Sequence, residues 1–193
     1  MNKFFVMLAL AFLGASFAGA SDLSYTNVAI GYQQGEIGDQ DHSGIGVFGN
    51  FAVNDSLFVL AGYSALESDD EVNTGFGSGT IDRTALNLGL GFHAPIADKA
   101  DFVTSVAYSD QEAEFAGMTS DGNGYVLSAG VRALPTGKVE LNAFVNYADI
   151  EDESDTAVAA SARYAASPAV SFGLTFSSAD DADIVTLDGQ YAF

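Results

Sequence analysis

Hydrophobic and polar residues alternate along most of the chain, with an apolar side chain at every second position. In the clearest segment, Leu86, Leu88 and Leu90 share one face, and small or polar side chains occupy the positions between them. A period of two is typical of a β-strand with one apolar face. The pattern occurs in ten segments: residues 28–32, 45–51, 57–63, 84–92, 102–108, 125–131, 139–147, 160–164, 170–176 and 185–193.

The polar face of these segments indicates which way the apolar face points. It is dominated by Gly, Ala, Ser, Asn or a charged residue, which are too small and polar for the core of a soluble sandwich. The apolar face should therefore point outward, into lipid, and segments of about 9–11 residues match a tilted strand that crosses a bilayer. We predict an all-β protein, an antiparallel up-and-down transmembrane β-barrel of ten strands. A barrel of eight strands is the second choice. It ranks below ten strands because it would leave two clear segments unpaired.

Aromatic residues lie at both ends of the predicted strands, on the apolar face. Such rings mark the two headgroup layers of a membrane barrel. One predicted girdle contains Tyr32, Tyr63, Tyr108, Tyr125 and Tyr147, and the other contains Phe51, Phe92, Phe102, Tyr164, Tyr191 and Phe193.

The connections between segments alternate in length. Short links with Pro and other turn formers occur near residues 54–56, 95–100, 135–137 and 167–168, whereas residues 66–82 and 110–124 form longer links. Short periplasmic turns and longer outer loops are the bacterial outer-membrane arrangement. We therefore expect the long links to lie outside the cell.

The first residues have the features of a targeting segment. Lys3 is followed by an apolar run over residues 4–17 and by Ala18-Gly19-Ala20, the small residues that signal peptidase requires. We expect a signal peptide at residues 1–20 and a barrel domain at residues 21–193. The expected location is the outer membrane of a Gram-negative bacterium, reached by export.

The chain is strongly acidic, with 26 Asp and Glu residues against six Lys and Arg, and it has no cysteine. This charge argues against nucleic acid as a partner and favours cations. Most acids fall in the long-side links, where divalent ions could bridge them to lipopolysaccharide. Weak candidates for divalent-cation contacts are Asp180, Asp181, Asp183, Glu151, Asp152, Glu153 and Asp155. No twelve-residue calcium loop is present, so a shared cation atmosphere is favoured over a defined metal site.

An enzyme at the outer rim would need a catalytic constellation. Asp41 and His42 are the only candidates, and neither a second His nor an activated Ser accompanies them at a suitable spacing. We expect a non-enzymatic protein without a cofactor.

Charged residues also occur on the inward face of the predicted barrel. They are Arg83, Arg132, Glu140, Arg163 and Asp188. Charges inside a narrow barrel normally pair. If residues 135–137 form the turn, Arg132 stands directly opposite Glu140 and forms a salt bridge with it. The alternative is a narrow, cation-biased, porin-like channel, because ten strands enclose more space than eight.

Several motifs carry a family resemblance: Leu23-Ser24-Tyr25, residues 58–63, 88–92 and 129–132, Gly124-Tyr125, and residues 189–193. On these, the chain resembles the diffusible-signal-factor-regulated outer-membrane proteins, and distantly the OmpA and OmpX class. The resemblance implies a signal for the outer-membrane insertion machinery, with Tyr191 and Phe193 at its aromatic positions. Asp188 departs from it, because that signal usually has Gly there.

The sequence thus favours a structural or surface-interaction role for an acidic extracellular surface, with the narrow channel as alternative. An adhesin would rest on the outer links alone, which carry few aromatic residues beyond Phe76 and Phe115.

Overall fold

The computed structural model describes residues 23–74, 77–151 and 153–193, apart from the side chain of Thr74. The predicted signal peptide lies outside the described residues. The described chain consists of strands and turns, and no helix in it is long and apolar enough to cross a membrane. The strands are β1 (Asn27–Ile37), β2 (Gln40–Ala52), β3 (Leu57–Ser68), β4 (Val72–Thr74), β5 (Gly77–Gly79), β6 (Ile81–Ala97), β7 (Ala100–Phe115), β8 (Met118–Thr136), β9 (Val139–Ile150), β10 (Glu153–Ala165), β11 (Val170–Ala179) and β12 (Ala182–Ala192).

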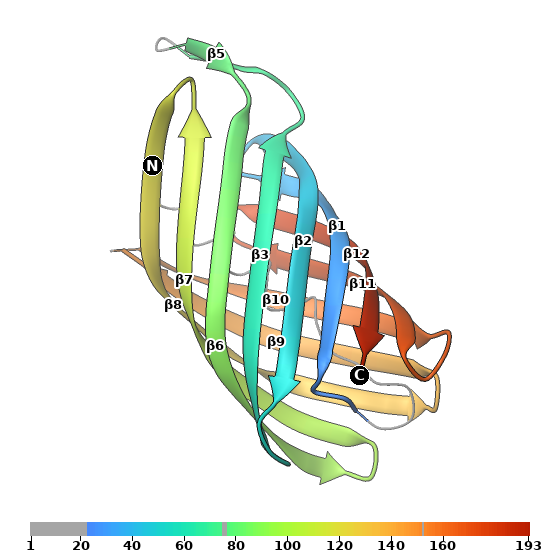
Figure 1. Cartoon of the computed structure of the whole chain (residues 1–193). Helices are drawn as coiled ribbons and strands as arrows, with labels where there is room; N and C mark the ends of the chain where they lie inside the picture. Colours follow the sequence, from blue (N-terminus) through green and yellow to red (C-terminus); the bar gives the residue numbers. More distant parts are fainter. Residues whose placement is uncertain (1–22, 75–76, 152) are drawn as a thin grey trace.

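Ten of these strands form one closed antiparallel barrel (Figure 1). Each strand pairs with its neighbour in sequence, except that β3 pairs with β6 and the barrel closes where β1 pairs with β12. Strands β4 and β5 form a separate two-stranded sheet in the β3–β6 connection. The prediction of ten strands is confirmed, and the eight-stranded alternative is wrong. Closure pairs the backbone groups of every strand, which lipid could not satisfy.

The alternation predicts the two faces of the sheet correctly. Along β3 and β9, exposed and buried side chains alternate almost without a break. Outward residues such as Ile30 and Leu90 are each 60% exposed in the isolated chain. All eleven side chains of the two predicted girdles are exposed as well. The apolar outer surface therefore has the form that a bilayer would cover.

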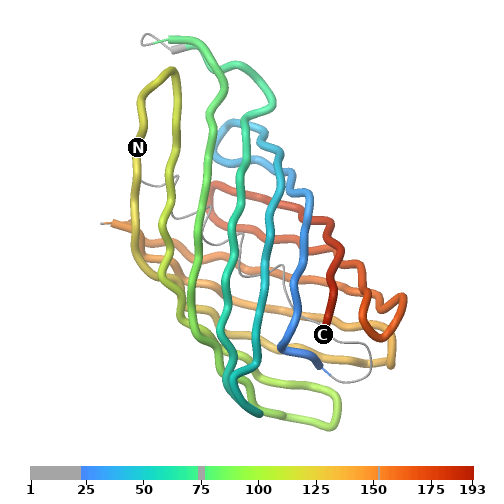
Figure 2. Tube along the Cα trace, viewed as in Figure 1, coloured from blue at the N-terminus to red at the C-terminus, as the bar shows by residue number. Residues whose placement is uncertain are grey.

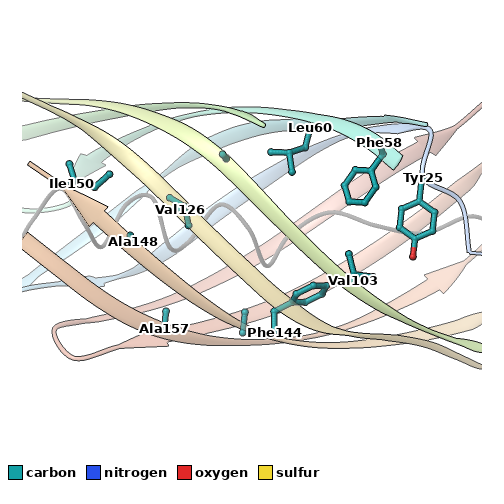
Figure 3. Packing of buried hydrophobic residues seen from close by; sticks show 11 residues of the cluster. Tyr25, Phe58, Leu60, Val103, Val126, Phe144, Ala148, Ile150 and Ala157 are labelled. Carbon is teal, nitrogen blue, oxygen red and sulfur yellow. The ribbon is translucent and has the colours of Figure 1, made fainter. Parts of the chain in front are cut away.

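The inner face differs from the prediction of small and polar residues, because large apolar side chains also point inward. Figure 3 shows Phe58 and Phe144 inside the barrel, together with aliphatic residues of the same cluster. These two rings lie next to inward glycines in register on the adjacent strand, Phe58 beside Gly91 and Phe144 beside Gly130. A Cβ atom at either glycine would collide with the ring. The glycines thus make room for the aromatic rings, a pairing known to stabilise sheets.

One end of the barrel contains the start of β1, the end of β12 and the turns after β2, β6, β8 and β10. In outer-membrane barrels this end faces the periplasm. At the other end, residues 110–124 do not form the expected long loop. Strands β7 and β8 continue to Phe115 and Met118, and only Ala116 and Gly117 turn, both with positive φ (50° and 77°). Two such residues make the tight turn that suits the twist of a hairpin. Figures 1 and 2 show this hairpin at the extracellular end beside β6.

Candidate functional site

Four charged side chains lie inside the periplasmic half of the barrel and are almost fully buried: Arg132, Glu140, Arg163 and Asp188. We call them the lumen charge belt. They come from β8, β9, β10 and β12, and their signs alternate around the wall. Two ion pairs join them, between Arg132 and Glu140 and between Arg163 and Asp188.

The first pair forms as expected, but its predicted register is wrong. Arg132 Nε donates to Glu140 Oε1 at 3.0 Å. Directly opposite Arg132, however, stands Asn142, and Glu140 stands opposite Arg163. The register shifts between Ala133 and Thr136, where Pro135 lies. Proline has no N–H for the ladder and is tolerated at such bulges. The shift of two residues keeps both side chains inward, and the long arginine reaches Glu140 diagonally.

The second pair spans the strand that lies between its two members. Arg163 Nη2 donates to Asp188 Oδ1 at 2.5 Å, although β11 separates β10 from β12. Gly173 on β11 is in register with both residues. A Cβ atom at this glycine would lie 2.6 Å from Arg163 Nη2 and 2.6 Å from Asp188 Oδ2, closer than van der Waals contact allows. The missing side chain of Gly173 is therefore what lets the pair form.

The segment before β1 enters the periplasmic mouth. We call residues Leu23–Thr26 the N-terminal strap, and Figure 3 shows Tyr25 beside Phe58. The Tyr25 ring stacks on His93 with ring centroids 3.6 Å apart and lies 5.1 Å from the Phe58 centroid. Its hydroxyl donates to Asp101 Oδ2 at 2.8 Å, and the Arg132 guanidinium carbon lies 4.4 Å from the ring centroid.

These four contacts of Tyr25 come from β3, β6, β7 and β8, and we call the four side chains the Tyr25 seat. His93 Nδ1 also lies 3.2 Å from Asp101 Oδ2 within the seat. Burial raises the pKa of the Tyr25 hydroxyl above its ordinary value, and the hydrogen bond to Asp101 adds to this. Tyr25 belongs to the Leu23-Ser24-Tyr25 motif of the family resemblance, but its position before the first alternating segment gives no sign that its side chain enters the lumen.

His42 and Arg83 meet near the extracellular end. Arg83 Nε donates to His42 Nε2 at 3.1 Å, so this nitrogen must be an acceptor and Nδ1 must carry the proton. Nδ1 then donates to the Gln40 carbonyl at 3.0 Å. His42 is buried and lies on β2, in the barrel wall. With both ring nitrogens engaged, His42 is not placed as a free general base beside Asp41.

Acidic residues gather on the outward face of β6, β7 and β8, beyond the tyrosine girdle. Glu114 stands directly opposite Asp82, and Glu112 stands directly opposite Asp121. We call Asp82, Asp110, Glu112, Glu114 and Asp121 the outer acidic face. Where it meets the girdle, Tyr108 donates its hydroxyl to Asp110 at 3.3 Å. Like charges directly opposite each other are unfavourable in a sheet, so this face favours counter-ions.

The described residues among the weak candidates for divalent-cation contacts lie in and next to the β9–β10 and β11–β12 turns. Within residues 23–74, 77–151 and 153–193, no group of three or more His, Asp or Glu side chains is arranged to hold a metal ion. Asp180 and Asp181 lie in the β11–β12 turn, with Asp183 on β12. Glu151 lies in the β9–β10 turn, Glu153 and Asp155 lie on β10, and Asp152 is outside the described residues.

The proposed insertion signal lies on the outer surface at the periplasmic end. Tyr191 and Phe193 are exposed, and their rings stack with centroids 6.3 Å apart. Asp188, which departs from the usual signal, points inward and pairs with Arg163. The ion pair accounts for an acid at this position.

The fold is similar to those of solved outer-membrane proteins. The NanC porin is 7% identical, with 85% of this chain and 98% of that chain covered and a TM-score of 0.52. The translocator domain of the autotransporter NalP from Neisseria meningitidis is 11% identical, with 97% and 92% covered and the same TM-score of 0.52. The KdgM porin is 13% identical, with 86% and 99% covered and a TM-score of 0.46.

No curated protein sequence matches the chain. The sequence model of the outer membrane protein beta-barrel domain matches residues 5–176, which is most of the chain. The protein therefore belongs to the outer membrane protein beta-barrel domain family.

Proposed function

We propose that this protein is a non-enzymatic component of the outer membrane whose lumen is closed and whose acidic outer surface is the functional part. The observation that carries this proposal is the pairing of the lumen charge belt. In a conducting pore, charges line a water-filled path, whereas here each belt carboxylate accepts a hydrogen bond from a buried arginine. Inward rings such as Phe58 and Phe144 support the same conclusion, because they reduce the polar lining that ions require.

The outer acidic face supports a surface role. It continues the lipid-facing side of the barrel just beyond the Tyr108 and Tyr125 ring positions, where headgroups of the outer leaflet lie. Lipopolysaccharide headgroups are anionic, so contact with them requires bridging divalent cations. We propose that Mg²⁺ or Ca²⁺ links this face to lipopolysaccharide through a shared ion atmosphere.

Binding to lipid surfaces tests the surface role. Purified barrel in detergent is added to supported bilayers with and without lipopolysaccharide, in millimolar Mg²⁺ or in chelator. Retention should depend on both lipopolysaccharide and Mg²⁺, and the triple variant Glu112→Gln, Glu114→Gln, Asp121→Asn should lose that dependence. Asp55→Asn, an exposed acid in the β2–β3 turn, is the control and should behave like wild type. Retention unaffected by chelator would contradict the proposal.

A narrow cation-biased channel is the competing function. The NanC neighbour is described as a porin, and the ten strands enclose more space than a filled eight-stranded barrel. Recording from planar bilayers separates the two functions. We expect no current steps from the wild-type protein, whereas regular cation-selective steps would establish the channel.

Export and insertion complete the proposal. Signal-peptide cleavage after Ala20 would give a mature protein that begins at Ser21, which intact-mass measurement of protein from outer membranes tests. The C-terminal Tyr191 and Phe193 would be read by the insertion machinery. Membership of the diffusible-signal-factor-regulated group remains a sequence-based prediction.

A further inference from the structure

The N-terminal strap crosses from one side of the periplasmic mouth to the other. Next to β1, Thr26 is hydrogen-bonded to the end of β2 and to the C-terminal residue. Its Oγ1 accepts from Ala52 N at 3.1 Å, and its carbonyl accepts from Phe193 N at 3.3 Å. One residue earlier, Tyr25 reaches its seat on β3, β6, β7 and β8. In the barrel order, β7 and β8 lie far around the wall from β1. The strap therefore bridges the mouth.

The Tyr25 seat is specific for a ring that carries a hydroxyl. The Tyr25 ring stacks on the aromatic ring of His93, and the Arg132 guanidinium carbon lies 4.4 Å from the Tyr25 ring centroid. Asp101 Oδ2 accepts a hydrogen bond from the Tyr25 hydroxyl at 2.8 Å. Stacking, cation–π contact and a satisfied hydroxyl are the interactions that anchor a buried tyrosine.

Arg132 joins the strap to the lumen charge belt. Its Nε donates to Glu140, whereas Nη1 and Nη2 each lie 3.4 Å from the Ser24 carbonyl oxygen. The same guanidinium stacks on Tyr25. Glu140 thus positions the Arg132 guanidinium, which in turn contacts the N-terminal strap. Loss of the Glu140 carboxylate should therefore let Arg132 move and weaken the binding of Tyr25 in its seat.

We propose that the N-terminal strap is a built-in plug of the periplasmic mouth, with Tyr25 as its anchor and Arg132 as its coupling to the lumen charge belt. The inference rests on the proposed closed lumen and adds how the periplasmic end is sealed. The inference gives Tyr25 and His93 a shared role in the plug, a role that the alternation pattern does not indicate for either residue.

Thiol labelling tests the plug, because the chain has no cysteine. Val103 points inward on β7 in register with His93, so Val103→Cys reports access to the mouth. Folded protein in detergent is treated with a charged maleimide. Tyr25→Ala should raise the labelling rate about tenfold or more, as expected when a local seal opens. Tyr25→Phe keeps the stacking and should raise it less, and Tyr32→Ala, a girdle tyrosine, should leave it unchanged.

Glu140→Gln tests the coupling through Arg132 and should raise the rate severalfold. If Tyr25→Ala fails to fold, Thr26→Val removes only the anchor to Ala52 and should still raise the rate. A Tyr25→Ala rate equal to that of Val103→Cys alone would overturn the plug, and a Glu140→Gln rate equal to it would overturn the coupling. Current steps from the wild-type protein would instead overturn the closed lumen, so the two failures are distinguishable.

Discussion

The periplasmic and extracellular halves of the barrel neutralise their charges in different ways. In the periplasmic half, the acids Glu140 and Asp188 point inward, and each has an arginine at hydrogen-bond distance. In the extracellular half, acids such as Glu112 and Asp121 face each other across strands on the outer surface. Of the Lys and Arg residues in the described part of the chain, only Arg83 lies in the extracellular half.

The difference shows that charges in one sheet can be compensated either by side chains of opposite charge or by ions from the solvent. A buried charge must be compensated from within, because desolvation penalises it heavily. The charge of an exposed acid can be screened by mobile cations from the solvent, including divalent ions. Stability of the periplasmic half should therefore depend on particular partners, and that of the outer acidic face on ionic conditions.

The largest effect should come from breaking the lumen charge belt. Glu140→Ala leaves Arg132 without its carboxylate, and breaking a buried pair in this way costs about 3–5 kcal/mol, less where water enters. The temperature at which the folded barrel unfolds, read from its mobility on a gel, should fall clearly.

Adding Arg132→Ala should recover part of that loss, because it removes the unpaired charge. The recovery should be incomplete, because Arg132 also contacts Tyr25 and the Ser24 carbonyl. Strict additivity of the two single losses would contradict a direct pair.

The next effect should come from closing the gap between Arg163 and Asp188. Gly173→Ala places a Cβ atom 2.6 Å from both charged groups and forces them to shift, at a typical overpacking cost of about 1–3 kcal/mol. Gly189→Ala is the matched control on the next strand, because its Cβ would lie 3.8 Å from Phe172. Urea unfolding in detergent should separate the two variants. Equal stabilities would show that the pair tolerates a side chain between its members.

A smaller effect should appear at alkaline pH. The pKa of Tyr25 is raised on folding, so the unfolded chain loses this proton first as pH rises above about 10. Stability from this group is present below that pH and falls above it, by at most about 1.4 kcal/mol per pH unit. Tyr25→Phe has no proton to lose and should show a shallower decline between pH 10 and the limit of the measurement. Parallel declines would indicate that Tyr25 is not buried in its seat.

The smallest effect should come from the outer acidic face. Glu112→Gln removes one of two like charges directly opposite each other, and such pairs change stability by about 0.2–1 kcal/mol. We expect a gain in chelator at low salt that disappears in millimolar Mg²⁺. Asp55→Asn in the periplasmic turn should show no gain, and a gain independent of Mg²⁺ would contradict compensation by the medium.

Particular residues show how far the sequence alone could lead. The outward phase of Tyr32 and Tyr191 followed directly from the alternation, because a strand offers only two faces. The contact of Arg132 with Glu140 was predictable for the same reason, but its register was not. The bulge at Pro135 depends on how two strands meet at a turn, which alternation does not report.

Local pattern by itself determined the closed barrel, its strand number, its aromatic girdles and the inward phase of the buried charges, because strand periodicity and lipid exposure both act residue by residue. Only the tertiary structure decided the register of the Arg132–Glu140 pair. It also decided that the absence of a side chain at Gly173 lets the Arg163–Asp188 pair span β11, and that Tyr25 lies in the mouth. The contacts of Tyr25 join segments far apart in sequence, such as Tyr25 and Asp101, and alternation along one strand cannot report them.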